Sequence, residues 1–133
     1  MRKASIILFY TAGTLMLIGG IGDQFINKLL DVHQQYLGNP EPSEFMTKAE
    51  SLLILMLHSV GGGLISAGVS MLALTHFGIR NDLKWTVWTT VAVAFIAQGF
   101  NGYSMYSAGS YYYYPLAILI LTGAAAILYK KYQ

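Results

Sequence analysis

Long apolar runs are the feature that most restricts what this chain can fold into. Residues 4–22 carry no charged side chain, and residues 51–75 contain His58 as their only ionisable group. Two further apolar runs cover residues 85–106 and 111–129. A helix needs about 20 mainly apolar residues to cross the roughly 30 Å hydrocarbon core of a membrane. The sequence therefore predicts an all-α integral membrane protein, with four transmembrane helices bundled into a single domain over residues 1–133.

Composition supports a membrane location and excludes several classes of protein. Charged residues make up 11% of the chain, whereas a soluble domain has about 25%. The net charge is only +2, and the basic residues do not gather on one face, so no nucleic-acid partner is expected. The chain has no cysteine, which excludes disulfides and thiolate chemistry. No Ala-x-Ala-like site follows the first run, so we expect a retained helix rather than a signal peptide.

The distribution of basic residues predicts the orientation of the chain. With four spans, six basic residues share a side with both termini, and only Lys28 and Lys48 lie on the other side. The six are Arg2, Lys3, Arg80, Lys84, Lys130 and Lys131. Positive charge favours the cytoplasmic side. We therefore expect a multi-pass protein of a bacterial inner (plasma) membrane, with both termini cytoplasmic and residues 23–50 outside.

Residues 23–37, between the first two runs, have the spacing of an amphipathic helix. Phe25, Ile26, Leu29 and Leu30 follow the i, i+3, i+4 pattern that places apolar side chains on one helix face. The sequence leaves open whether this segment continues the first helix or lies on the membrane surface. The Thr47–Glu50 sequence resembles a capping box, so we expect the second span to begin there. Gly78 is a predicted C-cap at its far end.

Small residues indicate where helices pack closely. In lipid, helices approach one another where side chains are small. Gly62, Ser66 and Ser70 recur at four-residue spacing along the second span. We expect this row to pack against another helix, either within the subunit or between subunits.

Polar side chains inside a membrane are costly, so each one is a candidate for a binding role. His58 lies about two helical turns past Glu50, and Gln98 and Asn101 share a face of the third span. All of these fall in the predicted outer half of the membrane, where tyrosines of the last two spans also gather. The candidate ligand-binding residues are Asp23, His33, Glu50, His58, Gln98, Asn101 and Tyr103. Each also has a structural alternative, such as capping a helix or joining two helices by a hydrogen bond.

Metal and cofactor sites are not expected. His58 and His76 are separated by roughly 27 Å along one helix, too far apart to ligate one haem iron. His33 and His58 with a carboxylate are suitable zinc ligands, but they lack any signature spacing.

Three functions remain after these exclusions. The first is a binding protein or accessory subunit, with a polar–aromatic pocket in the outer half of the bundle for a hydrophobic or amphiphilic small molecule. The second is a membrane-embedded enzyme, in which His58 and Glu50 exchange a proton with a lipid or isoprenoid-like substrate. The third is a small oligomeric transporter, which the absence of a deep acidic residue disfavours. Membrane lipid is the expected surrounding, and a homo-oligomer or a larger membrane complex stays open.

Overall fold

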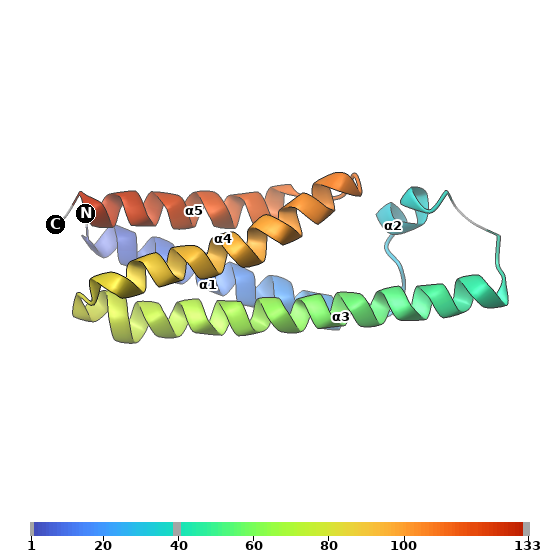
Figure 1. The fold of residues 1–133 in the computed structure, drawn as a ribbon, viewed down its shortest axis with the longest axis horizontal. Coiled ribbons are helices and arrows are strands. Elements are labelled where there is room, and N and C mark those ends of the chain that lie inside the picture. The colour runs from blue at the N-terminus through green and yellow to red at the C-terminus, as the bar shows by residue number, and fades with distance from the viewer. Residues whose placement is uncertain (1, 39–40, 132–133) are drawn as a thin grey trace.

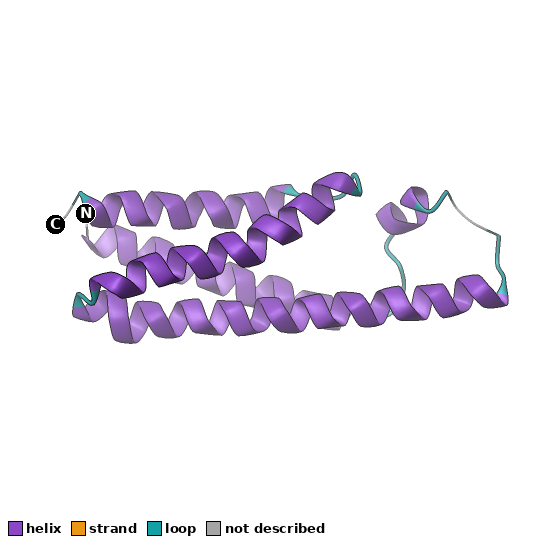
Figure 2. Cartoon of the chain, in the orientation of Figure 1, coloured by secondary structure: helices purple, strands orange, loops and turns teal. Residues whose placement is uncertain are grey.

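The computed structural model describes residues 2–38 and 41–131, and every regular element in these ranges is a helix (Figure 2). The helices are α1 (Arg2–Gln24), α2 (Asp31–Tyr36), α3 (Glu44–Ala73), α4 (Lys84–Ser107) and α5 (Tyr113–Lys130). A π turn, η1 (Leu74–Gly78), and a 3₁₀ turn, η2 (Ile79–Asn81), extend α3. The all-α prediction is confirmed for the described residues, and long helices cover all four apolar runs.

Three of these helices are long and apolar enough to cross a membrane. They are α1, the continuous Glu44–Asn81 helix, and α5. Helix α4 has 24 residues and is long enough, but it is less apolar than the other three. The Glu44–Asn81 helix has 38 residues, or roughly 57 Å of helix. It is therefore much longer than a hydrocarbon core of about 30 Å requires.

The four long helices lie side by side (Figure 1). Helix α1 begins and helix α5 ends at the same end of the bundle, where both termini lie. Arg2 holds this end together, because its guanidinium lies 3.0 Å from Asp82 and donates a 2.6 Å hydrogen bond to the Arg80 carbonyl. We call the opposite end the distal end. There α3 extends past the other helices, and α2 lies beside this extension (Figure 1).

The core consists of apolar side chains with hydroxyl groups between them. Phe9, Met16 and Ile118 are fully buried, and so are several threonines. Each buried threonine satisfies its hydroxyl locally; for example, Thr90 donates to the Thr86 carbonyl at 2.7 Å and Thr122 to the Ile118 carbonyl at 2.8 Å. Ser5 instead joins two helices, with a 2.8 Å bond to the Ala125 carbonyl. These bonds let the hydroxyl-bearing residues lie inside the bundle with their hydroxyl groups paired.

Helices α1 and α3 meet through glycines, but not through the predicted row. A Cβ on Gly20 would lie 2.6 Å from the Gly61 carbonyl oxygen, and a Cβ on Gly68 would lie 2.7 Å from the Leu17 nitrogen. Gly62, Ser66 and Ser70 are exposed in this structure. The predicted packing of that row within the subunit is therefore wrong. The spacing was suitable, but the neighbouring stripe through Gly61 and Gly68 is the one that faces α1.

Both predicted ends of the second span also differ from the structure. Helix α3 begins at Glu44, capped by Ser43, whose hydroxyl accepts a 3.1 Å bond from the Met46 nitrogen. The capping box at residues 47–50 is therefore inside the helix. At the other end Gly78 lies within the π turn, where a Cβ would lie 2.3 Å from a Thr86 methyl carbon. The chain reverses at Asp82, whose φ of 59° is left-handed.

The predicted helix over residues 23–37 is interrupted. Helix α1 continues to Gln24, residues 25–30 have no regular helix, and α2 covers only Asp31–Tyr36. The prediction of one amphipathic helix is therefore wrong for 25–30. Side chains from α3 bind the backbone of this stretch and replace its helical hydrogen bonds, as described below.

Candidate functional site

The most polar cleft of the molecule lies near the distal end, between the long helices. Its volume is about 440 Å³. Every α-helix contributes: α1 and α3 form one side, α4 the other, and α5 and α2 contribute one residue each. The lining residues are Gly19, Asp23, His33, Leu57, Val60, Leu64, Ala97, Phe100, Asn101, Ser104, Met105, Ala108, Ser110 and Tyr114. We call this space the distal cleft.

Asp23 supplies the carboxylate of the distal cleft. It lies in the last turn of α1, where close packing against α3 fixes its backbone: a Cβ on Gly61 would lie 2.6 Å from the Cβ of Asp23. The side chain is half-buried and has no hydrogen bond or ion pair with another side chain of the described residues. An acceptor of two or more hydrogen bonds is thus available at the cleft.

Asn101 lies on the opposite wall and is supported by Gln98. The Asn101 amide donates to the Gln98 side-chain oxygen at 3.3 Å, as expected for two residues on one face of α4. Gln98 is fully buried, and its side-chain nitrogen has no partner among the described residues. Gln98 does not line the distal cleft; it contributes to a separate groove of about 240 Å³ between α4 and α5. Its role in the structure is therefore to orient Asn101.

His33 connects the distal cleft with a second, almost wholly apolar cleft of about 250 Å³ beneath α2. Four residues line both spaces: His33, Leu57, Val60 and Ala108. The Nδ1 atom of His33 is buried and has no partner in the described part of the chain. The two clefts are therefore neighbours, one with polar groups in its wall and one lined by aliphatic and aromatic side chains.

His58 and Glu50 belong to a different structure from the distal cleft. His58 Nε2 lies 2.7 Å from the Ile26 carbonyl oxygen, so this nitrogen carries the proton, and Glu50 accepts a 3.2 Å bond from the Leu29 nitrogen. Gln24 adds a 2.7 Å bond to the His58 carbonyl. We call these three bonds the α3 clamp. The bonds of His58 and Glu50 tie residues 25–30 to α3, and the Gln24 bond ties the end of α1 to it; they pair the Ile26 carbonyl and the Leu29 nitrogen, which have no helical partner here.

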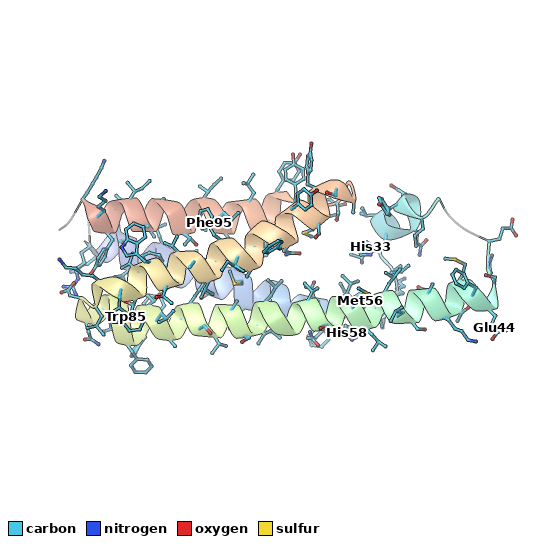
Figure 3. All side chains as sticks on the ribbon, in the orientation of Figure 1. His33, Glu44, Met56, His58, Trp85 and Phe95 are labelled. Carbon is cyan, nitrogen blue, oxygen red and sulfur yellow. The ribbon has the colours of Figure 1, made fainter. Side chains whose placement is uncertain are left out.

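The hydrogen-bond partner of the His58 ring is therefore a backbone carbonyl and not another of the candidate ligand-binding residues. In Figure 3, His33 belongs to α2 on one side of α3, and His58 lies along the opposite edge of α3. Since neither His58 nor Glu50 lines the distal cleft, their geometry gives no support to an acid–base role there.

Tyrosines surround the distal end, but only Tyr114 lines the distal cleft. Its hydroxyl donates to the Leu15 carbonyl, and the absence of a side chain on Gly19 leaves room for its ring. Tyr103, a predicted site residue, is exposed and lines the groove beside Gln98. Tyr112 stacks on Tyr113 at 4.3 Å between ring centroids. A side-chain hydrogen bond with Tyr113 raises the pKa of Tyr112.

Of the seven predicted site residues, the structure brings Asp23, His33 and Asn101 to one cleft and leaves Glu50, His58, Gln98 and Tyr103 outside it. Ser104 and Met105 also line the cleft and were not predicted. Their signal was present, because both follow Asn101 at helical i+3 and i+4 spacing. No group of three or more His, Asp or Glu side chains with the geometry of a metal site occurs among the described residues.

This chain matches no known family model, no curated protein and no solved structure. Its function must therefore be argued from the geometry of the distal cleft and from the position of that cleft in the bundle.

Proposed function

We propose that this chain is a four-span membrane protein that binds one amphiphilic molecule in the distal cleft. The observation that carries the proposal is the pairing of the two clefts. The distal cleft offers Asp23, Asn101 and His33, and the adjoining cleft beneath α2 offers an apolar lining. Binding pockets for small molecules typically combine an apolar wall with a few polar groups that fix orientation. A ligand with one polar end and one apolar end suits this pair of spaces.

The exposed face of α4 supports its role as the fourth span. Its low hydropathy comes partly from Thr86, Thr90 and Gln98, and all three are buried. The side chains that α4 presents outward include Phe95 and Ile96. Trp85 and Trp88 lie at its start, as expected for a helix entering the membrane interface. Lipid would thus contact an apolar surface, while the polar residues face the other helices.

The positions of the basic residues support both termini being cytoplasmic. Arg2, Arg80 and Lys130 gather at the end of the bundle that carries the termini, and Lys28 and Lys48 belong to the distal part. In this orientation the distal cleft faces the outside, and the α3 extension with α2 rises above the hydrocarbon.

Cysteine labelling tests this orientation cleanly, because the chain has no native cysteine. We expect Glu41→Cys, in the α2–α3 connection, to react with a membrane-impermeant maleimide in intact cells. Leu83→Cys, in the α3–α4 turn, is the matched control and should react only after permeabilisation. Both positions are exposed in the structure. The reverse labelling pattern would show that the distal cleft faces the cytoplasm.

A cleft-filling substitution tests ligand binding. Ser104 lines the distal cleft, and Ser107, one turn further along α4, lines none of the clefts described here. We expect native mass spectrometry of the purified protein to show a one-to-one adduct with dodecyl amphiphiles. Ser104→Phe should weaken this binding by about tenfold or more, because the added ring would occupy cleft space that the ligand needs. Overpacking of this kind costs roughly 1–3 kcal/mol.

Ser107→Phe is the control for the general effect of an added ring on α4, and it should bind as the parent protein does. Equal binding by both variants and the parent, or no saturable adduct at all, would contradict the proposed function.

A further inference from the structure

We propose that the polar end of the bound amphiphile is a cation, an alkylammonium group, with Asp23 as its counter-ion. The inference rests on the proposed function and names the ligand class for the same cleft. It depends on the charges that line the cleft and on the partners that Asp23 lacks.

Among the described residues, the lining of the distal cleft has one acidic side chain and no lysine or arginine. The other polar lining groups are neutral or weakly basic: Asn101, Ser104, Ser110, Tyr114 and His33. A carboxylate without a basic neighbour attracts a positive group and repels a negative one. At a half-buried carboxylate between apolar helices this attraction is screened less than it would be in bulk water.

Among the described residues, no basic side chain forms an ion pair with Asp23 in place of a bound cation. Both ion pairs between the described residues lie elsewhere, one between Arg2 and Asp82 and one between Lys48 and Glu44. Two titratable neighbours, His58 and Tyr114, interact electrostatically with Asp23. His58 Nε2 bonds to the Ile26 carbonyl and the Tyr114 hydroxyl to the Leu15 carbonyl, and neither side chain makes an ion pair with Asp23. A buried or half-buried carboxylate is stabilised by an oppositely charged partner that pairs with it. A bound cation would supply that partner for Asp23.

The surrounding walls suit an alkylammonium group better than a strongly hydrated metal ion. Phe100 and Tyr114 supply aromatic rings, and Met105 supplies a polarisable thioether. Rings and carboxylates together bind ammonium groups, since the ring face carries negative partial charge. Lys and Arg are absent from this lining, which argues against phosphate or carboxylate headgroups. The alkyl chain would extend past His33 into the apolar cleft lined by Leu29, Leu53 and Met56.

The test compares dodecyl probes that differ in headgroup charge: dodecyltrimethylammonium, neutral dodecyldimethylamine oxide and dodecyl sulfate. Titration of the purified full-length protein, followed by native mass spectrometry, should show the cation binding about tenfold more tightly than the neutral probe. The anion should bind more weakly than both. This comparison uses the unmodified protein, so it does not depend on a variant folding correctly.

Asp23→Asn then assigns the preference to one side chain, because it keeps the shape and removes the charge. We expect it to lose the tenfold preference for the cation while binding dodecyldimethylamine oxide as the parent does. Asp31→Asn, at the exposed start of α2, is the matched control and should keep the preference.

The outcomes separate this inference from the proposed function. If cationic and neutral probes bind equally and Ser104→Phe weakens both, the ligand class is wrong and the binding function stands. If the parent protein prefers the cation but Asp23→Asn keeps that preference, Asp23 is not the counter-ion. If no probe binds in a way that Ser104→Phe reduces, the proposed function fails.

Discussion

Gly20→Leu is expected to prevent α1 and α3 from packing at their closest approach. A Cβ at this position would lie 2.6 Å from the Gly61 carbonyl oxygen and 2.7 Å from the Ile65 nitrogen. Both are backbone atoms, which cannot move without shifting the helix. Overpacking costs typically 1–3 kcal/mol and sometimes more, and here the added side chain meets backbone rather than a flexible neighbour. We expect a loss of about 3 kcal/mol, or a fall in Tm on the order of 10 °C.

Gly22→Leu is the matched control on the same helix, because a Cβ there has no neighbour within 4 Å. On α3, Gly61→Leu and Gly62→Leu form a second pair with the same contrast. Thermal unfolding followed by circular dichroism in detergent micelles measures all four variants. If Gly20→Leu and Gly22→Leu unfold at the same temperature, the helices do not meet through Gly20.

His58→Phe is expected to release residues 25–30 from α3. The substitution removes the 2.7 Å hydrogen bond to the Ile26 carbonyl and leaves that acceptor without its partner. The net loss is about 1–2 kcal/mol, which corresponds to a roughly five- to thirtyfold rise in local opening. Lys28 is exposed, and the next peptide nitrogen, that of Leu29, is bound by Glu50. Tryptic cleavage after Lys28 should accelerate by that factor, while global unfolding changes much less.

His76→Phe is the control for this experiment, since His76 bonds to Tyr10 at the opposite end of the bundle. It should leave cleavage after Lys28 unchanged. Glu50→Leu, which removes the second bond of the α3 clamp, should also accelerate cleavage. An unchanged cleavage rate in both His58→Phe and Glu50→Leu would show that the α3 clamp does not hold this segment.

Under the proposed function, the α3 clamp also affects the ligand. Leu29 belongs to the clamped segment and His33 to the helix that follows it, and both line the apolar cleft beneath α2. Release of residues 25–30 would move one wall of that cleft. His58 would then influence binding through the position of α2, without touching the ligand, which differs from the direct role first considered for it.

The candidate site was predicted only in part, and the reason is geometric. Asp23, His33 and Asn101 were expected to converge from three segments, and they line one cleft. Glu50 and His58 are grouped with them because helical spacing puts both on one face of the second span, in the predicted outer half of the membrane. Spacing fixes the direction of two side chains relative to each other, but not the direction of their common face relative to other helices. That face is turned toward residues 26–29, where backbone groups accept and donate the bonds.

The sequence alone determined the helical architecture and its approximate boundaries. Uncharged runs of about 20 residues are long enough to cross a membrane as helices, and a helix satisfies its backbone hydrogen bonds within itself, as lipid requires. The tertiary structure decided which faces meet. Small residues occur on two adjacent stripes of α3, through Gly61 and Gly68 and through Gly62 and Ser66. A rotation of the helix by one residue exchanges these stripes at no cost in local propensity. Contact with the α1 backbone at Gly20 selects the first stripe, and that contact exists only once the helices are assembled.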